Sequence, residues 1–246
     1  MSHHSLLSQK VERSELKVGD HIYNWRTLYT HHGIYIGEGK IIHLVNPKRG
    51  AKGGRLLAPF KGFSTSSGGD GKKEKTSCST SFCRSEKVAG SGVRLSCIDC
   101  FVKEGMLCRF EYQVSRVFLL ASIVGGTCTT AESDPPEEVI HRAKYLYENG
   151  YAKYNLRNNN CEDFALYCKT GLWSTDKRYQ GRSSQANMVH PTSQDNKHKD
   201  LVENVVRYAT AIPRTFSKRE DKDLGVRKDV VKVPVEELSS FCASLK

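Results

Sequence analysis

The chain has 246 residues, a formal net charge of +11, a hydrophobic content of 38% and a mean hydropathy of −0.53. These values predict one domain with a modest core. The sequence also excludes a membrane-spanning protein. Its longest apolar run, VFLLASIV at residues 117–124, is far shorter than the roughly 20 residues that a spanning helix needs. Basic and acidic residues are interspersed without a nucleic-acid fold signature, so we expect no nucleic-acid partner. The charge indicates either an ordinary basic surface or weak attraction to anionic lipid.

The N-terminal residues 1–15 are polar and contain no apolar segment of the kind found in signal peptides. We expect a loose tail there, on an intracellular, cytoplasmic protein whose nine cysteines are reduced by default. A GD turn then leads into the first strand of a domain that we place at residues 16–178. Beyond it, residues 179–246 are predicted to form a polar, basic extension with weak helix potential at residues 200–212.

The stretch HHGIYIGEGKIIHLVNP at residues 31–47 predicts a hairpin, because two β-rich runs flank a short GEG turn. His31 and His32 open the first strand, and His43 closes the second. Twelve residues separate His31 from His43, and a tight turn brings strand ends at that separation side by side. The histidines are either ordinary strand-end residues or the base and orienting group of a thiol nucleophile.

Residues 61–95 are rich in Gly, Ser and Lys, and we expect a surface insertion there. A C-x4-C pair precedes a C-x2-C pair by thirteen residues, and four thiolates in two pairs can bind structural zinc tetrahedrally. The candidate ligands are Cys78, Cys83, Cys97 and Cys100, with Cys108 as a substitute because the first pair is wider than usual. Unligated surface thiols and a redox role are the alternatives.

Further along the chain, FEYQVSRVFLL at residues 110–120 resumes strand character, and the apolar run at 117–124 is predicted to be a buried strand. Residues 133–150 carry helix signals, with Ser133 or Asp134 as the cap, prolines in the first turn and Gly150 as the stop. A second helix follows three consecutive asparagines and ends near Gly171, a natural C-terminal cap residue.

A cysteine stands at the start of this second helix. Asn159 or Asn160 is a suitable N-cap, which places Cys161 in the first turn, where open amides and the helix dipole favour a thiolate. A cysteine at a helix edge is also often an inert small hydrophobic residue. The combination with paired histidines favours a nucleophile. His32 should face the other side of its strand, and it is the alternative base ahead of His21.

The stretches YTHHGIYIGEGKIIHL and NNNCEDFALYC together resemble the lecithin:retinol acyltransferase (LRAT) family. In that family a base histidine begins the pattern H-x-x-x-Y-[IV]-G-x-G, a second histidine follows twelve residues later, and the nucleophile lies in an NCE tripeptide before a helix. By position, the resemblance implies His31 as base, His43 as third member and Cys161 as nucleophile. It covers about residues 16–178 and is closest to the plant members, which carry SDPPE and NNNCEDFA. Asp163 stands where the animal enzymes have histidine.

The resemblance implies an α+β fold of the permuted papain-like (NlpC-like) type, with a small antiparallel sheet packed against helices and the nucleophile at a helix N-terminus. It also implies a thiol-dependent acyltransferase or phospholipase A that acts on glycerophospholipid esters without a catalytic cofactor. We expect lipid substrates, peripheral contact with anionic membranes and no transmembrane anchor. The alternatives are a cysteine amidase or peptidase of the same superfamily and a non-catalytic binding module.

Overall fold

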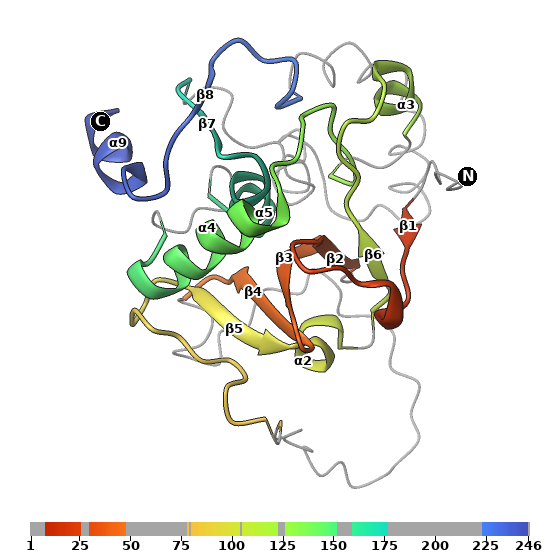
Figure 1. The fold of residues 1–246 in the computed structure, drawn as a ribbon, viewed down its shortest axis with the longest axis vertical. Coiled ribbons are helices and arrows are strands. Elements are labelled where there is room, and N and C mark those ends of the chain that lie inside the picture. Colours follow the sequence, from red (N-terminus) through yellow and green to blue (C-terminus); the bar gives the residue numbers. More distant parts are fainter. Residues whose placement is uncertain are drawn as a thin grey trace, which may run out of the picture.

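The computed structural model describes residues 8–25, 30–47, 78, 80–103, 105–122, 126–151, 159–176 and 223–245 (Figure 1). Most of the predicted insertion and the weak helix potential at residues 200–212 lie outside these ranges. The described residues form a mixed α+β fold in which an antiparallel sheet packs against helices, as the sequence predicts.

The main sheet has six strands in the order β1-β6-β2-β3-β4-β5, and all of the neighbouring pairs are antiparallel. The predicted hairpin is confirmed: β3 and β4 pair with Ile34 opposite Ile42, and Glu38 and Gly39 turn the chain with positive φ. The strands are β1 (Gln9–Lys10), β2 (His21–Trp25), β3 (Thr30–Gly37), β4 (Lys40–Leu44), β5 (Val93–Cys97) and β6 (Leu107–Arg109).

Two edges of this sheet correct the sequence analysis. Residues expected in a loose N-terminal tail form β1, which pairs with β6, and the short 3-10 helix η1 (Arg13–Glu15). At the other edge, the last residues of the expected insertion form β5, which pairs along the whole of β4. Both edge strands form because they pair with strands that lie far away in the sequence, and a polar local sequence does not indicate such pairing.

The apolar run at residues 117–124 was wrongly predicted as a buried strand. It begins instead with the helix α3 (Arg116–Ala121), whose N-cap Ser115 accepts a hydrogen bond from the Phe118 backbone N–H. Only Leu119 of this helix is buried, and Val117 is 77% exposed. A short apolar run does not by itself distinguish strand from helix, and here a capping serine starts a helix.

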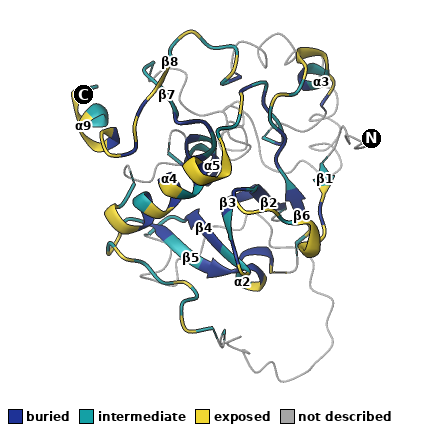
Figure 2. Ribbon diagram, viewed as in Figure 1, coloured by how far each residue is buried: buried dark blue, intermediate teal, exposed yellow. Residues whose placement is uncertain are grey.

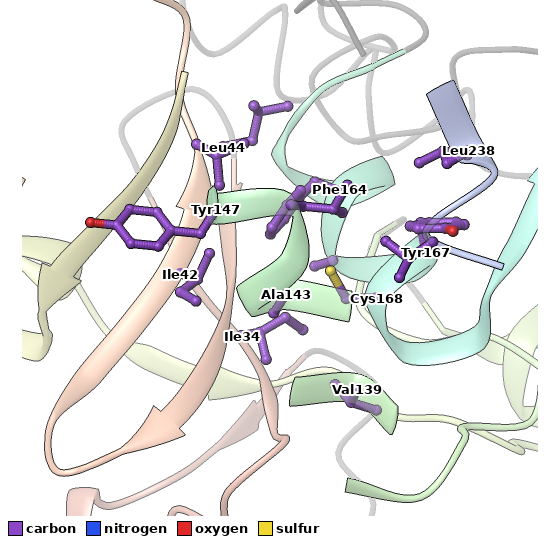
Figure 3. Packing of buried hydrophobic residues seen from close by; sticks show 14 of the residues in the cluster. Ile34, Ile42, Leu44, Val139, Ala143, Tyr147, Phe164, Tyr167, Cys168 and Leu238 are labelled. Carbon is purple, nitrogen blue, oxygen red and sulfur yellow. The ribbon is translucent and has the colours of Figure 1, made fainter. Parts of the chain in front are cut away.

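Helices α4 (Pro136–Asn149) and α5 (Cys161–Thr170) cover one face of the sheet, and the short helix α2 (Ile98–Val102) packs against the other (Figures 1 and 2). The core between α4, α5 and the sheet contains Ile34, Ile42, Leu44, Val139, Ala143, Phe164 and Cys168 (Figure 3). The side chains that alternate on β3 and β4 therefore point either to the α5 side or to the α2 side.

The C-terminal residues complete the same core. Strand β8 (Val230–Lys232) pairs with β7 (Leu172–Ser174), and α9 (Leu238–Ser244) follows it. The hydrophobic cluster formed by side chains of α4, α5 and the sheet also includes the buried residues Val233, Val235 and Leu238. Part of the sequence placed in the C-terminal extension thus covers the helical layer.

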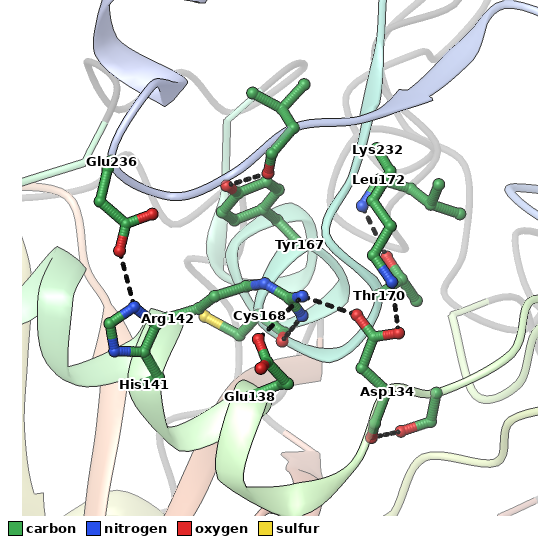
Figure 4. A network of polar contacts seen from close by, with 12 residues as sticks. Asp134, Glu138, His141, Arg142, Tyr167, Cys168, Thr170, Leu172, Lys232 and Glu236 are labelled. Atoms are coloured by element: carbon green, nitrogen blue, oxygen red, sulfur yellow. Dashed lines mark hydrogen bonds and ion pairs between the residues drawn. The ribbon is translucent and has the colours of Figure 1, made fainter.

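The first predicted helix is confirmed as α4, but its cap is not Ser133 or Asp134, because the N-cap is Pro135 and no side chain caps it. The Asp134 carboxylate instead lies 2.7 Å from Arg142 and 2.6 Å from Lys232. Arg142 also donates a hydrogen bond to the Cys168 carbonyl at 3.0 Å. These contacts join α4, α5 and β8 (Figure 4).

Candidate active site

The start of α5 has the geometry that the sequence predicts. The Asn160 side chain accepts hydrogen bonds from the backbone N–H groups of Glu162 and Asp163, and the Asp163 carboxylate accepts one from the Asn160 N–H at 3.0 Å. This reciprocal capping box explains an acidic residue at position 163. Gly171 ends the helix in the left-handed region, with φ 67°.

Cys161 is the first residue of α5 and is 1% exposed. Its Sγ lies 3.9 Å from the carbonyl oxygen of Thr30, the first residue of β3. The next residue along that strand is His31. The α5 helix therefore brings the thiol to the start of the strand that carries the predicted base.

His31 and His43 lie in direct contact, with His31 Nε2 2.9 Å from His43 Nδ1. The second nitrogen of His43, Nε2, lies 2.9 Å from the Ser96 hydroxyl on β5. The Phe101 ring packs against both imidazoles, at centroid distances of 5.3 and 5.4 Å. The juxtaposition of the two histidines that the hairpin predicts is thus present in the structure, and their chemical roles stay predictions.

Space for this histidine pair depends on Gly33. A Cβ at this position would lie 2.7 Å from Ile41, 2.9 Å from Phe101 and 3.0 Å from the Cβ of His43. All three distances are shorter than, or at the limit of, real side-chain contacts. The glycine therefore allows Phe101 to close over the α2 side of the sheet, where it touches both imidazoles.

His32 points to the opposite, α5 side of β3, as the strand alternation predicts. Its Nδ1 lies 2.9 Å from His21 Nε2, and its Nε2 lies 2.8 Å from the Thr30 hydroxyl. His21 Nδ1 lies 2.8 Å from the Tyr112 hydroxyl. Burial lowers the pKa of His32 to about 3. Burial also holds the pKa of His21 well below its usual range, and the nearby His32 ring and Lys169 ammonium further oppose a positive charge on His21. Both rings are therefore neutral near pH 7.

Comparison with known proteins identifies the family. The profile described as Lecithin retinol acyltransferase matches residues 14–174. This chain belongs to the lecithin retinol acyltransferase family. It is 42% identical to "Protein LEAD-SENSITIVE 1" of Arabidopsis thaliana over 246 residues, which cover 97% of this chain and 92% of that protein. This similarity agrees with the predicted plant type, and the name of the relative states no catalytic activity.

The structure adds residues to this LRAT-family site that sequence reasoning missed. Ser96 reaches His43 from 53 positions further along the chain, and Phe101 comes from α2. The buried pair of His21 and Tyr112 was also unforeseen. Each depends on strand order across the sheet, so no local motif indicated it. The only hint in the sequence was the position of Ser96 directly before the C-x2-C pair, and it did not indicate a contact with His43.

The described part of this LRAT-family chain contains a cluster of four cysteines that could hold a metal ion. Their sulfur atoms all lie within 4.8 Å of one another, and the cluster comprises Cys78, Cys83, Cys97 and Cys100. Cys108 was wrongly suggested as a substitute ligand. It lies on β6, separated from β5 by three strands of the sheet, and is buried beside Tyr23 and Phe110. Among the described residues, no helix is long and apolar enough to cross a membrane.

Proposed function

We propose that this LRAT-family protein is a thiol-dependent acyltransferase or phospholipase A that acts on glycerophospholipid esters. The observation that carries the proposal is the hydrogen-bonded pair of His31 and His43, placed at the start of β3 where the Cys161 thiol arrives. Family membership supports acyltransferase-type chemistry. A histidine strand that precedes the cysteine helix also fits the permuted papain-like arrangement.

His31 is the proposed general base. The thiol proton goes to His31 Nδ1, because His31 Nε2 faces His43. This assignment requires an Nε2–H tautomer of His31 that donates to His43 Nδ1, and His43 in turn donates its Nε2–H to Ser96. The two hydrogen bonds fix the orientation of the His31 ring and leave its Nδ1 unprotonated, so that this nitrogen accepts the thiol proton.

The place of this transfer is the start of β3. The imidazoles face the α2 side, whereas the body of α5 packs on the opposite side of the sheet. The β3–β4 pairs run from Gly37 opposite Lys40 only as far as Ile34 opposite Ile42. His31 is the second residue of β3, where this strand pairs with β2, and we propose that the thiol and the base meet around the start of β3 rather than through the sheet.

The Cys161 thiolate then attacks the ester carbonyl, and the backbone N–H at the start of α5 stabilises the oxyanion. The tetrahedral species collapses to an acyl-cysteine thioester, and the lysolipid alcohol leaves with the proton from His31. Water attack on the thioester gives a free fatty acid, which is phospholipase activity. An amine or alcohol acceptor gives the acylated product, and the thiol is regenerated in both cases.

His32 is a poor alternative base. Both of its ring nitrogens lie within hydrogen-bonding distance of His21 and Thr30, and burial holds its pKa at about 3. Its Nε2 also lies 3.7 Å from the buried Glu162 carboxylate. We assign His32 to positioning the start of β3 against the start of α5.

The proposed chemistry uses protein groups alone. The four-cysteine cluster is proposed to hold a structural zinc ion that takes no part in the reaction. The net charge of +11 supports peripheral contact with anionic membranes, where phospholipid esters are available.

The test is release of fatty acid from phosphatidylcholine vesicles by the wild type, Cys161→Ala and Cys242→Ala. Cys242 serves as the control because it lies on α9, partly buried at the edge of the core, and not at the start of α5. We expect release by the wild type and Cys242→Ala, and background release by Cys161→Ala. Adding an amine acceptor separates hydrolysis from acyl transfer. Equal release by all three proteins would show that the thiol is not the nucleophile. Cleavage of amides but not esters would indicate an amidase, and folded but silent wild type would indicate a binding module.

A further inference from the structure

We propose that the four-cysteine cluster binds one Zn²⁺ ion as a tetrathiolate, and that this ion fixes the end of β5 from which Ser96 holds His43. The metal site itself is independent of the reaction, whereas its effect on activity rests on the proposed function. The ligands are Cys78, Cys83, Cys97 and Cys100.

The sulfur positions fit this ion. Zinc–sulfur bonds of about 2.3 Å in a tetrahedron place the sulfur atoms about 3.8 Å apart. The Sγ of Cys97 lies 3.5 Å from the Sγ of Cys78 and 3.5 Å from that of Cys83, and all four sulfur atoms lie within 4.8 Å of one another. Shifts of less than about 1 Å convert this arrangement into a regular ZnS4 site.

The groups around the sulfur atoms also suit thiolates. The Cys97 backbone N–H donates a hydrogen bond to Cys83 Sγ at 3.4 Å. The Arg84 guanidinium lies 3.8 Å from Cys100 Sγ, and a cation there offsets part of the net −2 charge of a zinc tetrathiolate. Borderline-soft Zn²⁺ and sulfur ligands in tetrahedral geometry match each other.

The ligands come from two separate pieces of the fold. Cys97 ends β5 and is the N-cap of α2, and Cys100 lies within α2. The other two ligands precede β5, in the segment that ends in the isolated bridge of Ser85 with Leu95. A bound ion therefore ties this polar segment to the junction of β5 and α2. Such a segment buries little apolar surface, and metal binding supplies the missing folding energy.

The same junction supports the histidine pair. Ser96 is 2% exposed, precedes Cys97 and hydrogen-bonds His43 at 2.9 Å. Phe101, which packs on both imidazoles, lies one residue after Cys100. Ser96 and Phe101, which contact the proposed catalytic histidines, are thus each adjacent in the sequence to a proposed zinc ligand. Loss of the ion should loosen both groups together.

Metal content tests the site directly. Full-length protein purified under reducing conditions without chelator should contain one zinc per chain, and Co²⁺ substitution should give thiolate-to-metal charge-transfer absorption. Cys83→Ser and Cys100→Ser should bind less than one tenth of this zinc, whereas Cys242→Ser should keep it. Less than 0.1 zinc per chain in wild type, before and after incubation with Zn²⁺ and reductant, would overturn the site. Disulfide formation among these cysteines in place of zinc would indicate the redox alternative.

Hydrogen exchange in the wild-type protein tests the coupling without any substitution. Chelation of wild-type zinc should raise amide exchange in β4 and β5 at least tenfold, while exchange in α4 changes little. Fatty-acid release should fall at least tenfold and recover when Zn²⁺ is restored. Unchanged exchange after complete zinc removal would overturn the coupling. If zinc-loaded protein releases no fatty acid, the proposed function fails, and the exchange result still decides the coupling.

Discussion

At the scale of single residues, two adjacent histidines have opposite surroundings. His31 points toward the α2 side and contacts His43, which is held by Ser96. His32 points toward the α5 side, where His21 and Thr30 engage both of its ring nitrogens. Of these two neighbouring residues on β3, His31 thus belongs to a hydrogen-bonded histidine pair suited to proton transfer. His32 belongs to a buried, neutral pair suited to a structural role.

The buried pair predicts a pH dependence of stability. Burial lowers the pKa of His32 from 6.5 to about 3, and that of His21 shifts in the same direction. Between pH 6.5 and the lowered pKa of each ring, the unfolded chain binds protons that the folded protein does not. The free energy of unfolding should therefore fall as pH falls below about 6.5, by up to about 1.4 kcal/mol per pH unit for each group.

Urea unfolding at pH 7.5, 6 and 5 measures this slope. The double variant His21→Phe with His32→Phe retains aromatic stacking on Phe110 and Tyr23, and it should show a shallower slope than wild type. The control His141→Gln changes an exposed histidine of α4 and should keep the wild-type slope. An unaltered slope in the double variant would count against the assignment of neutral buried rings.

At the scale of elements, the capped start of α5 decides where the thiol lies. Asn160 is fully buried, and its side chain accepts hydrogen bonds from two backbone N–H groups of the first turn. The body of the helix packs against β3 and β4 through Phe164 and Ala165. The cap and the packing together bring Cys161 to Thr30.

Loss of this cap should cost stability and disorder the thiol. Asn160→Ala should lower the free energy of unfolding by about 1 kcal/mol and reduce fatty-acid release by more than the small stability loss explains. Asn160→Ser retains a capping oxygen and should recover most of both. Thermal unfolding and the vesicle assay measure the two effects. Equal behaviour of the Ala and Ser variants would show that the cap does not position the thiol.

Sequence reasoning predicts the elements whose signals are local. The β3–β4 hairpin has its own turn, and α5 has its cap and its C-terminal glycine, Gly171. Strand β5 and the Ser96 contact depend on a partner strand that lies about fifty residues away in the chain, so composition conceals them. The prediction for residues 117–124 was wrong because an apolar run of that length suits either a strand or a helix.

At the scale of the whole molecule, residues from both ends of the described chain complete the fold. Strand β1 adds an edge to the sheet, and β8 and α9 cover the helical layer (Figure 1). Lys232 and Arg142 share the Asp134 carboxylate, which links β8 to α4 (Figure 4). The C-terminal segment is therefore part of the core that supports α5.

Truncation of a buried side chain in α9 should destabilise the whole domain. Leu238 is 3% exposed and packs in the cluster that contains Cys161 and Tyr167. Leu238→Ala should reduce the free energy of unfolding by about 2–5 kcal/mol. Ser240→Ala, an exposed change on the same helix, should stay within about 0.5 kcal/mol of wild type. Matching stabilities of the two variants in urea unfolding would contradict a shared core.

Rapid-quench mass spectrometry of the protein mixed with short-chain phosphatidylcholine is the most direct test of Cys161 as nucleophile and His31 as base. Wild type should gain one acyl mass, removable with hydroxylamine and located at Cys161. His31→Gln should form this adduct about 10²–10⁴-fold more slowly, and Cys161→Ala should form none. Wild-type adduct rates in His31→Gln, or an acyl group on another residue, would contradict the proposed thiol and base.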